Sequence, residues 1–533
     1  FDGVFADKEI SDGSSATDVT PWELLWSKLP EDAVATDKKA TESAVDKQIK
    51  PKSVIDTLSN NDADKALIKA SIKNDFSLNE AMLALIVDRL FAFKSSRKVL
   101  TLSVDAHKKL DTLMPRLLAV LLASEHAVER ENLGAESLDQ NSLVEDSTAI
   151  DNEQFANLLI RILNWLESIV TRTSYLSLLI ENPQIIKHLV TLFKSSSWVV
   201  ETLTQIPALL DELLDPELLY SLPEKKSLRD ELRQRLLRLE PDDLEAQMEV
   251  LRYFKLAHYL HVAACEITGS LPLMKVSDYL TLIAEVVLEQ VLRFAWSSLG
   301  SRHGYPEGTS DNTTNFLVVG YGKLGGIEMS YSSDLDLVFI YDAAPQGMTD
   351  GERPLDSQTF YTRLGQKMIH VMNIRSLSGQ LYDIDMRLRP SGNSGMLVTS
   401  ISAFERYQKK EAWVWEHQAL VRARAVAGDA ELNQRFIEVR KDVLCQKRDR
   451  KRLKAAVCEM REKMRDHLGG SSKTNDLQGK NADKTHEFHL KQGAGGIVDI
   501  EFMVQYAVLL WSYEAPSLCQ WTDNIRLLES LHN

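Results

Sequence analysis

The sequence predicts an α+β protein that is mostly helical, with a small mixed sheet set between helical regions. Three observations support this class. Apolar residues recur at helical spacing along most of the chain before residue 312. Short strand-like apolar runs appear only within 312–445, and helical spacing returns in 446–533. We therefore expect a mixed domain at 312–445 between two helical regions.

The helical region before the sheet is predicted over 63–311. Its pattern is clearest in Phe155–Val170, where the apolar residues fall on one helix face. An acidic, serine-containing stretch at Glu136–Glu153 interrupts the pattern and predicts an exposed loop. Residues 1–62 alternate short apolar runs with polar, small-residue stretches, so we expect a linker or a partly disordered segment there.

Three strands are predicted in the mixed domain, at Phe316–Gly320, Leu335–Tyr341 and Leu381–Leu388. The first is a continuous apolar run, the second is a strand-like run that includes Asp336, and the third alternates strictly. Region 446–533 is predicted to be helical and truncated. Because the chain begins with Phe1 rather than Met, we expect a piece of a longer protein.

Composition narrows the possible function classes. The 533 residues carry a formal net charge of −15, which disfavours nonspecific binding to nucleic acid or to an anionic membrane. No apolar run approaches the roughly 20 residues that span a bilayer. The four cysteines lack Cys-x-x-Cys spacing, so we expect reduced thiols and a cytoplasmic protein.

A glycine-rich turn at Gly320–Gly326 directly follows the first predicted strand. Its glycines match the G-x-G-x-x-G pattern of dinucleotide-binding proteins, but that unit needs a full crossover helix and about 30 residues. Only Gly326–Ser333 separates this turn from the acidic run that follows. The Walker pattern also fails, because Lys323 is not followed by Ser or Thr. We expect the turn to bring backbone N–H groups against phosphates in another kind of site.

Two aspartates, Asp334 and Asp336, stand at the start of the second predicted strand. Alternate side chains of a strand share a face, so both carboxylates point the same way. Two such carboxylates repel each other and are costly to bury, and a divalent cation would offset that cost. Magnesium is typically held by one or two carboxylates together with substrate phosphates. A solvated strand end would explain one aspartate, whereas the pair after a glycine turn favours a metal site.

The alternating run Leu381–Leu388 offers a third carboxylate. Asp383, Asp385, Arg387 and Arg389 share one face of the predicted strand. A carboxylate from this face would complete a magnesium site, and the arginines would meet phosphate oxygens. By position alone, either aspartate fits, and a structural role for the arginines is equally open.

A glycine turn, an Asp-x-Asp pair and a third carboxylate on a nearby strand together resemble the DNA polymerase β-like nucleotidyltransferases. In that pattern, Gly322 and Lys323 resemble the Gly-Ser positions. The sequence departs from it at Lys323, where many members carry Ser. The lysine would either add a phosphate contact or simply replace the hydroxyl.

Longer motifs resemble the glutamine synthetase adenylyltransferase family more closely. They lie at Gly320–Gly326, Ser333–Phe339, Asp385–Gly392, Trp415–Arg424 and Gly495–Phe502. The resemblance covers most of the chain from about residue 155. The Trp415–Arg424 and Gly495–Phe502 motifs resemble the C-terminal, adenylylating domain of that family, and the preceding helices resemble its connecting region. Only one such centre is present, so the resemblance implies a chain without the adenylyl-removing domain.

The resemblance implies transfer of AMP from ATP to a tyrosine of glutamine synthetase, with release of pyrophosphate, as part of nitrogen regulation. The alternative is phosphorolytic removal of AMP, or another protein nucleotidyltransferase of this superfamily. Two Mg²⁺ ions, ATP, the PII signalling protein and glutamine as effector are implied as partners. The resemblance assigns catalysis and metal binding to Asp334, Asp336 and Asp385. It assigns nucleotide binding to Gly322, Lys323, Gly325, Gly326, Ser333, Arg387 and Arg389. Glu501 matches a family motif, but no role follows from it.

Overall fold

The computed structural model describes residues 80–135, 144–213, 222–240, 243–376, 379–468 and 489–532. The chain divides into two compact units, Phe1–Leu214 and Asp215–Asn533. The linker predicted at 1–62 lies outside the described residues. No helix in the described part of the chain is both long and apolar enough to cross a membrane.

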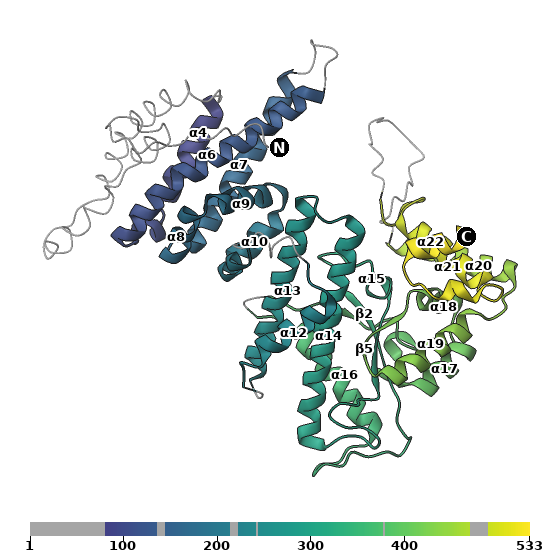
Figure 1. The fold of residues 1–533 in the computed structure, drawn as a ribbon. Coiled ribbons are helices and arrows are strands. Elements are labelled where there is room, and N and C mark those ends of the chain that lie inside the picture. The colour runs from purple at the N-terminus through teal and green to yellow at the C-terminus, as the bar shows by residue number, and fades with distance from the viewer. Residues whose placement is uncertain are drawn as a thin grey trace, which may run out of the picture. The chain divides into compact units, whose positions relative to one another are not determined.

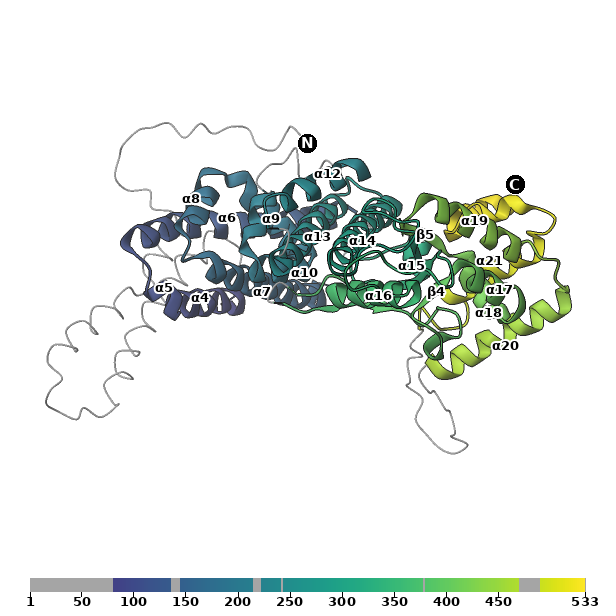
Figure 2. The same cartoon turned by 90° about the horizontal axis from the view of Figure 1, so that it is seen from below.

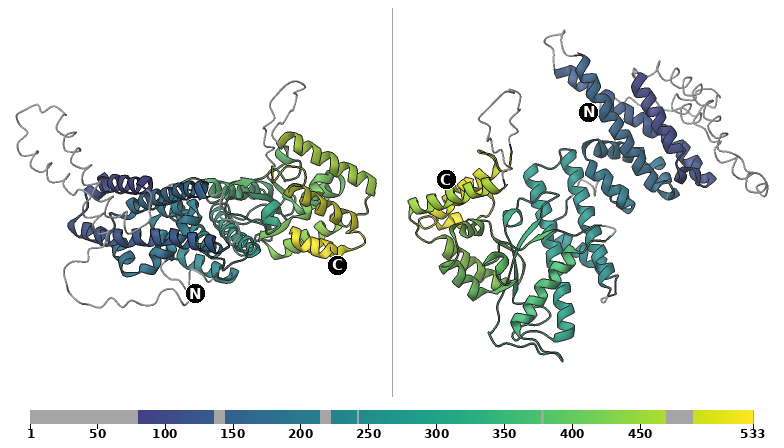
Figure 3. Two further views of the ribbon diagram at one scale, coloured as in Figure 1. Left: turned by 90° about the horizontal axis from the view of Figure 1, so that it is seen from above. Right: turned by 180° about the vertical axis from the view of Figure 1, so that it is seen from behind.

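The first unit is built of helices. Their bounds are α4 Glu80–Lys94, α5 Arg97–Leu100, α6 Val104–Ala135, α7 Val144–Ile169, α8 Thr173–Glu181, α9 Pro183–Ser195, α10 Ser197–Gln205 and the 3₁₀ helix η1 Pro207–Leu213. α7 packs against α4 and α10, and α6 packs against α8 and α9 (Figures 1 and 3). The predicted helical face of Phe155–Val170 is buried, with Leu159, Ile162 and Leu166 in the core.

The loop predicted at Glu136–Glu153 is wrong from Val144 onward, because α7 begins there. Residues 136–143 lie outside the described residues. Each residue added to an existing helix gains a hydrogen bond, so the packed turns that begin near Phe155 extend upstream through polar sequence.

In its described residues, the second unit starts with helices α12, α13 and α14 and continues into the sheet domain. The helices are α12 Lys225–Leu236, α13 Leu244–Ile267 and α14 Leu273–His303. The strands are β1 Phe316–Gly320, β2 Leu335–Tyr341, β3 Ile384–Asp385, β4 Val398–Ser400 and β5 Arg424–Gly428. The one-turn helix α15 (Gly322–Gly325) follows β1, and α16 (Ser357–Asn373) precedes β3. The later helices are α17 Ile401–Lys410, α18 Val414–Val421, α19 Ala430–Leu444, α20 Arg450–Leu468, α21 Ile497–Trp511 and α22 Asn524–His532.

The sheet is small and mixed, as the sequence predicts. β1 pairs antiparallel with β2 and with β5, whereas β2 pairs parallel with β3 and with β4. Together with the surrounding helices, it confirms the α+β class. The predicted strand Leu381–Leu388 is wrong in extent, because β3 covers only Ile384–Asp385. The backbone N–H of Arg387 donates to the Asp385 carboxylate at 2.8 Å, which turns the chain out of the sheet.

The two faces of the sheet are covered by different helices, as Figures 1 and 2 show. Phe316 and Phe339 face α16. The Phe316 ring lies 5.5 Å from the Phe339 ring and 5.9 Å from the Tyr361 ring, centroid to centroid, and Phe339 lies against Gly365. Val319 and Val338 belong to the opposite cluster, which includes apolar residues of α17, α18, α19 and α21. The alternation of β1 and β2 thus buries both faces, and polar groups remain only where the strands end.

Candidate active site

Asp336 and Asp385 lie side by side across the parallel pair of β2 and β3. The register places Leu335 opposite Ile384 and Asp336 opposite Asp385. The backbone N–H of Leu335 donates to the Asp383 carbonyl at 2.9 Å, which fixes this register. Paired residues of neighbouring strands project from the same face, so the two carboxylates share one side of the sheet.

The charge of Asp334 acts on Asp336 as the charge of Asp385 does. The pKa of Asp336 is raised to about 6, first by burial and then by the negative charges of Asp334 and Asp385. The positive charges of Arg387 and Arg422 lower the pKa of Asp336 and partly oppose this rise. The side chain of Asp383 instead accepts a hydrogen bond from Gln380 at 2.8 Å.

Asp385 has a cationic partner of its own. The Arg387 guanidinium donates through Nε to the carboxylate at 2.7 Å and forms an ion pair with it through its terminal nitrogen. These bonds lower the pKa of Asp385. The side chain of Arg387 is 74% exposed, so it is accessible to a ligand as well as to Asp385.

The glycine turn is tied to the aspartates through Gly322. Its φ is +54°, a region that side chains disfavour, and a Cβ there would overlap the Asp336 carboxylate. The neighbouring Tyr321 N–H donates to the Asp336 carbonyl at 2.8 Å. β1 and β2 are antiparallel and joined through the single turn α15, so no dinucleotide-type crossover exists here.

Gly325 and Gly326 are close to Arg422 rather than to the aspartates. A Cβ on Gly325 would overlap the Arg422 carbonyl, and a Cβ on Gly326 would overlap its guanidinium. The structure therefore explains these two glycines by close packing against one arginine.

The remaining predicted nucleotide-binding residues have varied surroundings. Lys323 is exposed on the turn. The Ser333 hydroxyl is buried and accepts a hydrogen bond from the Ser330 N–H at 2.9 Å. Arg389 donates to three carbonyls of its own loop, those of Met386 at 2.7 Å, Asn393 at 3.2 Å and Gly395 at 3.3 Å. Ser333 thus bonds within its own turn. Arg389 bonds within its own loop, and its charge also helps to lower the pKa of Asp385.

The carboxylates fit a magnesium ion by their chemistry. Among the described residues, no group of three His, Cys, Asp or Glu side chains is close enough to hold a metal ion by itself. However, magnesium is commonly held by one or two carboxylates and completed by substrate phosphates. The pKa of Asp336 is raised by burial first and then by the charges of Asp334 and Asp385, and a bound cation would offset both effects. The assignment of Asp334, Asp336 and Asp385 as metal ligands stays a prediction.

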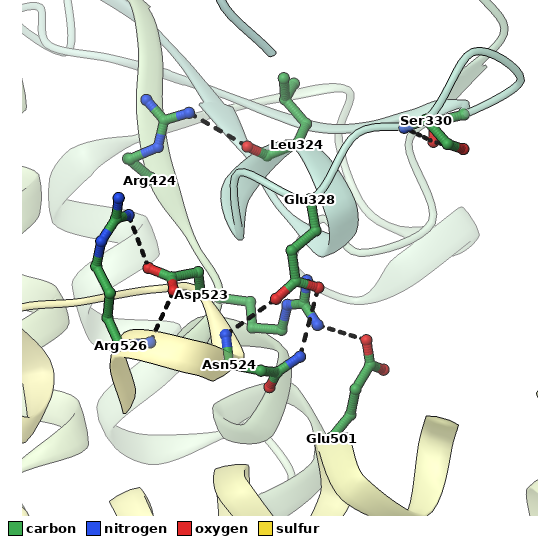
Figure 4. A network of polar contacts seen from close by, with 10 residues as sticks. Leu324, Glu328, Ser330, Arg424, Glu501, Asp523, Asn524 and Arg526 are labelled. Carbon is green, nitrogen blue, oxygen red and sulfur yellow. Dashed lines mark hydrogen bonds and ion pairs between the residues drawn. The ribbon is translucent and has the colours of Figure 1, made fainter. Parts of the chain in front are cut away.

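A buried arginine that sequence reasoning missed connects the glycine turn to the C-terminal helices. Arg422 donates to Glu328 at 2.5 Å and to Glu501 on α21. Glu328 also accepts from the backbone N–H of Asn524 at 2.9 Å. Figure 4 shows Glu328, Glu501 and Asn524 converging beneath the turn. Both Arg422 and Glu501 lie in quoted motifs, but nothing in those motifs indicates that they meet.

Arg424, two residues further on, holds the turn from another direction. It donates to the Leu324 carbonyl at 3.2 Å (Figure 4) and pairs with Glu285 of α14 at 2.6 Å. A cleft of about 790 Å³ lies toward the other end of β5, lined by residues that include Arg229, Trp296 and Gly428. The predicted carboxylates do not line this cleft, so we do not place the nucleotide there.

Known proteins share much of this sequence. A family model described as glutamate-ammonia ligase adenylyltransferase matches residues 186–439. A bifunctional glutamine synthetase adenylyltransferase/adenylyl-removing enzyme of Pseudomonas putida is 48% identical over 445 residues, which are 83% of this chain and 43% of that protein. The enzyme of the same name from Pseudomonas syringae pv. tomato is 51% identical over 80% of this chain and 43% of its own length. The one from Hahella chejuensis is 52% identical over 70% of this chain and 38% of its own length.

The chain thus spans less than half the length of the curated relatives it matches. The matched segments include the glycine turn and both aspartate-bearing strands, since the family model covers residues 186–439. On this similarity, the chain belongs to the family of bifunctional glutamine synthetase adenylyltransferase/adenylyl-removing enzymes.

Proposed function

We propose that this chain transfers AMP from ATP to a tyrosine of glutamine synthetase, releases pyrophosphate and thereby lowers glutamine synthetase activity. The observation that carries the proposal is the placement of Asp336 opposite Asp385, beside Gly322. Carboxylates from two separate strands lie together, and such a group would bind the cations that accompany a triphosphate. The names of the relatives supply the protein substrate.

In the proposed reaction, the tyrosine oxygen bonds to the α-phosphorus of ATP while the bond from that phosphorus to the bridging oxygen of pyrophosphate breaks. The phenol is protonated at neutral pH, because its reference pKa is about 10, so its proton passes to a carboxylate of the site or to solvent as the new bond forms. Asp334, Asp336 and Asp385 would hold two magnesium ions, which neutralise charge on the attacking and leaving oxygens when bound. Gly322 keeps space open beside Asp336, and exposed Arg387 offers donors to phosphate oxygens.

The test is incubation of the chain with glutamine synthetase, Mg²⁺ and ATP labelled on the α-phosphate. We expect label on a tyrosine of glutamine synthetase and an equal amount of pyrophosphate. Asp336→Asn should reduce the rate by at least about 10³-fold, because the transition-state charge loses its partner. No label with the parent chain would overturn the proposal.

The competing activity is phosphorolytic removal of AMP, because the related enzymes are named adenylyl-removing as well as adenylyltransferase. It is measured by supplying adenylylated glutamine synthetase and inorganic phosphate. Release of ADP, without label transfer in the first assay, would assign this chain to removal rather than addition.

Further proposals rest on the family resemblance. We propose the PII signalling protein and glutamine as effectors. We also propose the domain boundaries at 62/63, 311/312 and 445/446. A cytoplasmic location fits the four cysteines, which are all free thiols.

A further inference from the structure

We propose that Arg422 is a positioning residue that holds the glycine turn in its nucleotide-binding shape by linking it, through Glu328 and Glu501, to the C-terminal helices. The inference deepens the proposed function and rests on it for its kinetic test. Arg422 touches the turn and not the reacting atoms, so its role differs from that of the aspartates.

The first argument is the position of Arg422 in the chain. It caps the C-terminal end of α18 just before β5, and its side chain is only 4% exposed. Two carboxylates from distant parts of the sequence bind its guanidinium, Glu328 after the turn and Glu501 in α21. A buried guanidinium with two such partners is held in one position, because moving either carboxylate away would leave part of the buried positive charge unpaired.

The second argument is the contact between Arg422 and the turn. The guanidinium lies so close to Gly326 that any Cβ there would overlap it, and the Arg422 carbonyl approaches Gly325 equally closely. The turn therefore rests directly on Arg422. A shift of the guanidinium would change the space available to the turn.

The third argument is backbone strain at Ile327, between Gly326 and Glu328. Its φ is +55°, which is unfavourable for a β-branched residue. Such a conformation persists only where the surroundings impose it. Glu328, the next residue, is held by Arg422 and by the Asn524 N–H, so these bonds fix the chain immediately after the strained residue.

These observations give one prediction about the turn. If the Glu501 charge is removed, Arg422 keeps its ion pair with Glu328 but loses the ion pair that ties it to α21. The strain at Ile327 then favours relaxation of the turn away from the shape that accommodates Asp336 and a phosphate. ATP binding should weaken more than the chemical step.

The test variant is Glu501→Gln, which keeps the size of the side chain. Its matched control is Asp499→Asn on the same helix, because Asp499 pairs with Arg461 at 2.5 Å and with Arg465, away from the turn. Both are measured for adenylylation kinetics, binding of a non-hydrolysable ATP analogue with Mg²⁺, and thermal unfolding. Glu501→Gln should raise the KM for ATP about tenfold with a smaller fall in kcat, and Asp499→Asn should change only the unfolding temperature.

A rescue separates positioning from general stability. Glycine adopts positive φ without cost, so Ile327→Gly in the Glu501→Gln background should restore the KM to within about threefold of the parent. If Glu501 merely stabilised the C-terminal helices, this second change would restore nothing.

A readout independent of activity is hydrogen exchange at the amides of Gly325, Gly326 and Glu328. These amides donate within the turn at 2.8–3.0 Å in the parent chain. Glu501→Gln should speed their exchange, and Asp499→Asn should not. If Glu501→Gln exchanges faster but the parent chain does not label glutamine synthetase, the positioning role of Arg422 is retained and the proposed function is rejected. Unchanged exchange in Glu501→Gln would overturn the positioning role whatever the activity.

Discussion

At the scale of single residues, the glycines of the turn form one sequence pattern, but each is required for a different physical reason. Gly322 leaves room for the Asp336 carboxylate, Gly325 for the Arg422 carbonyl and Gly326 for the Arg422 guanidinium. Only the first lies against the predicted catalytic carboxylates. A glycine motif that suggests phosphate binding can thus also reflect close packing beneath the turn.

Gly322→Ala tests the first of these causes. The added Cβ meets both a positive φ and the Asp336 carboxylate, so we expect a loss of adenylylation of about 10²-fold or more. Gly308→Ala is the matched control, because Gly308 has φ +78° with open space around it. It should cost only the backbone strain, roughly 1–2 kcal/mol of unfolding free energy, and leave activity intact. Equal kinetics in the two variants would argue against a role for the Gly322–Asp336 contact.

At the scale of elements, helix α13 holds the short strand β3 in place. Arg252 donates to the Ile374 carbonyl at 2.8 Å, and Lys255 donates to the Leu381 carbonyl. The Lys255 ammonium also lies 4.1 Å from the centroid of the Tyr382 ring. Because β3 has only two residues, it makes few hydrogen bonds within the sheet. These bonds from α13 fix the chain segment that leads into β3.

Lys255 gives this contact a pH dependence. Burial lowers the pKa of Lys255 from 10.5 to about 8, against a smaller opposite effect of Asp383. The folded chain therefore releases this proton at lower pH than the unfolded chain. Stability rises with pH wherever the unfolded state binds more protons, which here is between pH 8 and 10.5.

Lys255→Met should remove that rise. In urea unfolding, the free energy of the parent minus that of the variant should increase from pH 7.5 to pH 10 by about 2–3 kcal/mol. Lys275→Met, at a lysine whose side chain is 59% exposed, is the control and should leave the difference nearly constant. A constant difference for Lys255→Met as well would mean that Lys255 is hydrated rather than buried.

At the scale of the whole molecule, the candidate site belongs to one of two compact units. The aspartates, the glycine turn and the arginines that support it all lie within Asp215–Asn533. The sheet in this unit has its own core on both faces, formed by residues of the same unit. This unit therefore has both its own core and all the described residues of the candidate site.

A chain limited to Asp215–Asn533 should therefore fold and bind ATP with Mg²⁺ nearly as tightly as the 533-residue chain. Calorimetry with a non-hydrolysable analogue would compare the two, and we expect dissociation constants within about threefold. Asp336→Asn in the shorter chain controls for nonspecific binding. A folded fragment that fails to bind would show that the first unit contributes to the nucleotide site.

Local pattern predicts much of this molecule because it depends on neighbours in the chain. The strand-like runs of β1 and β2 and the helical face of Phe155–Val170 follow from periods of two or 3.6 residues. The absence of a crossover helix after the glycine turn also follows from spacing alone, and the antiparallel pair of β1 and β2 confirms it.

Tertiary structure alone decides what depends on pairing between distant segments. The register of β2 and β3 places Asp385, rather than Asp383, opposite Asp336, although both lie on the same predicted face. The Arg387 N–H turns the chain after two residues of β3 and ends a strand that alternation would continue. Glu501 acquires a partner only because α21 packs near Arg422, 79 residues away in sequence. Periodicity assigns a face to each side chain, whereas register and long-range packing determine which side chains from different segments meet.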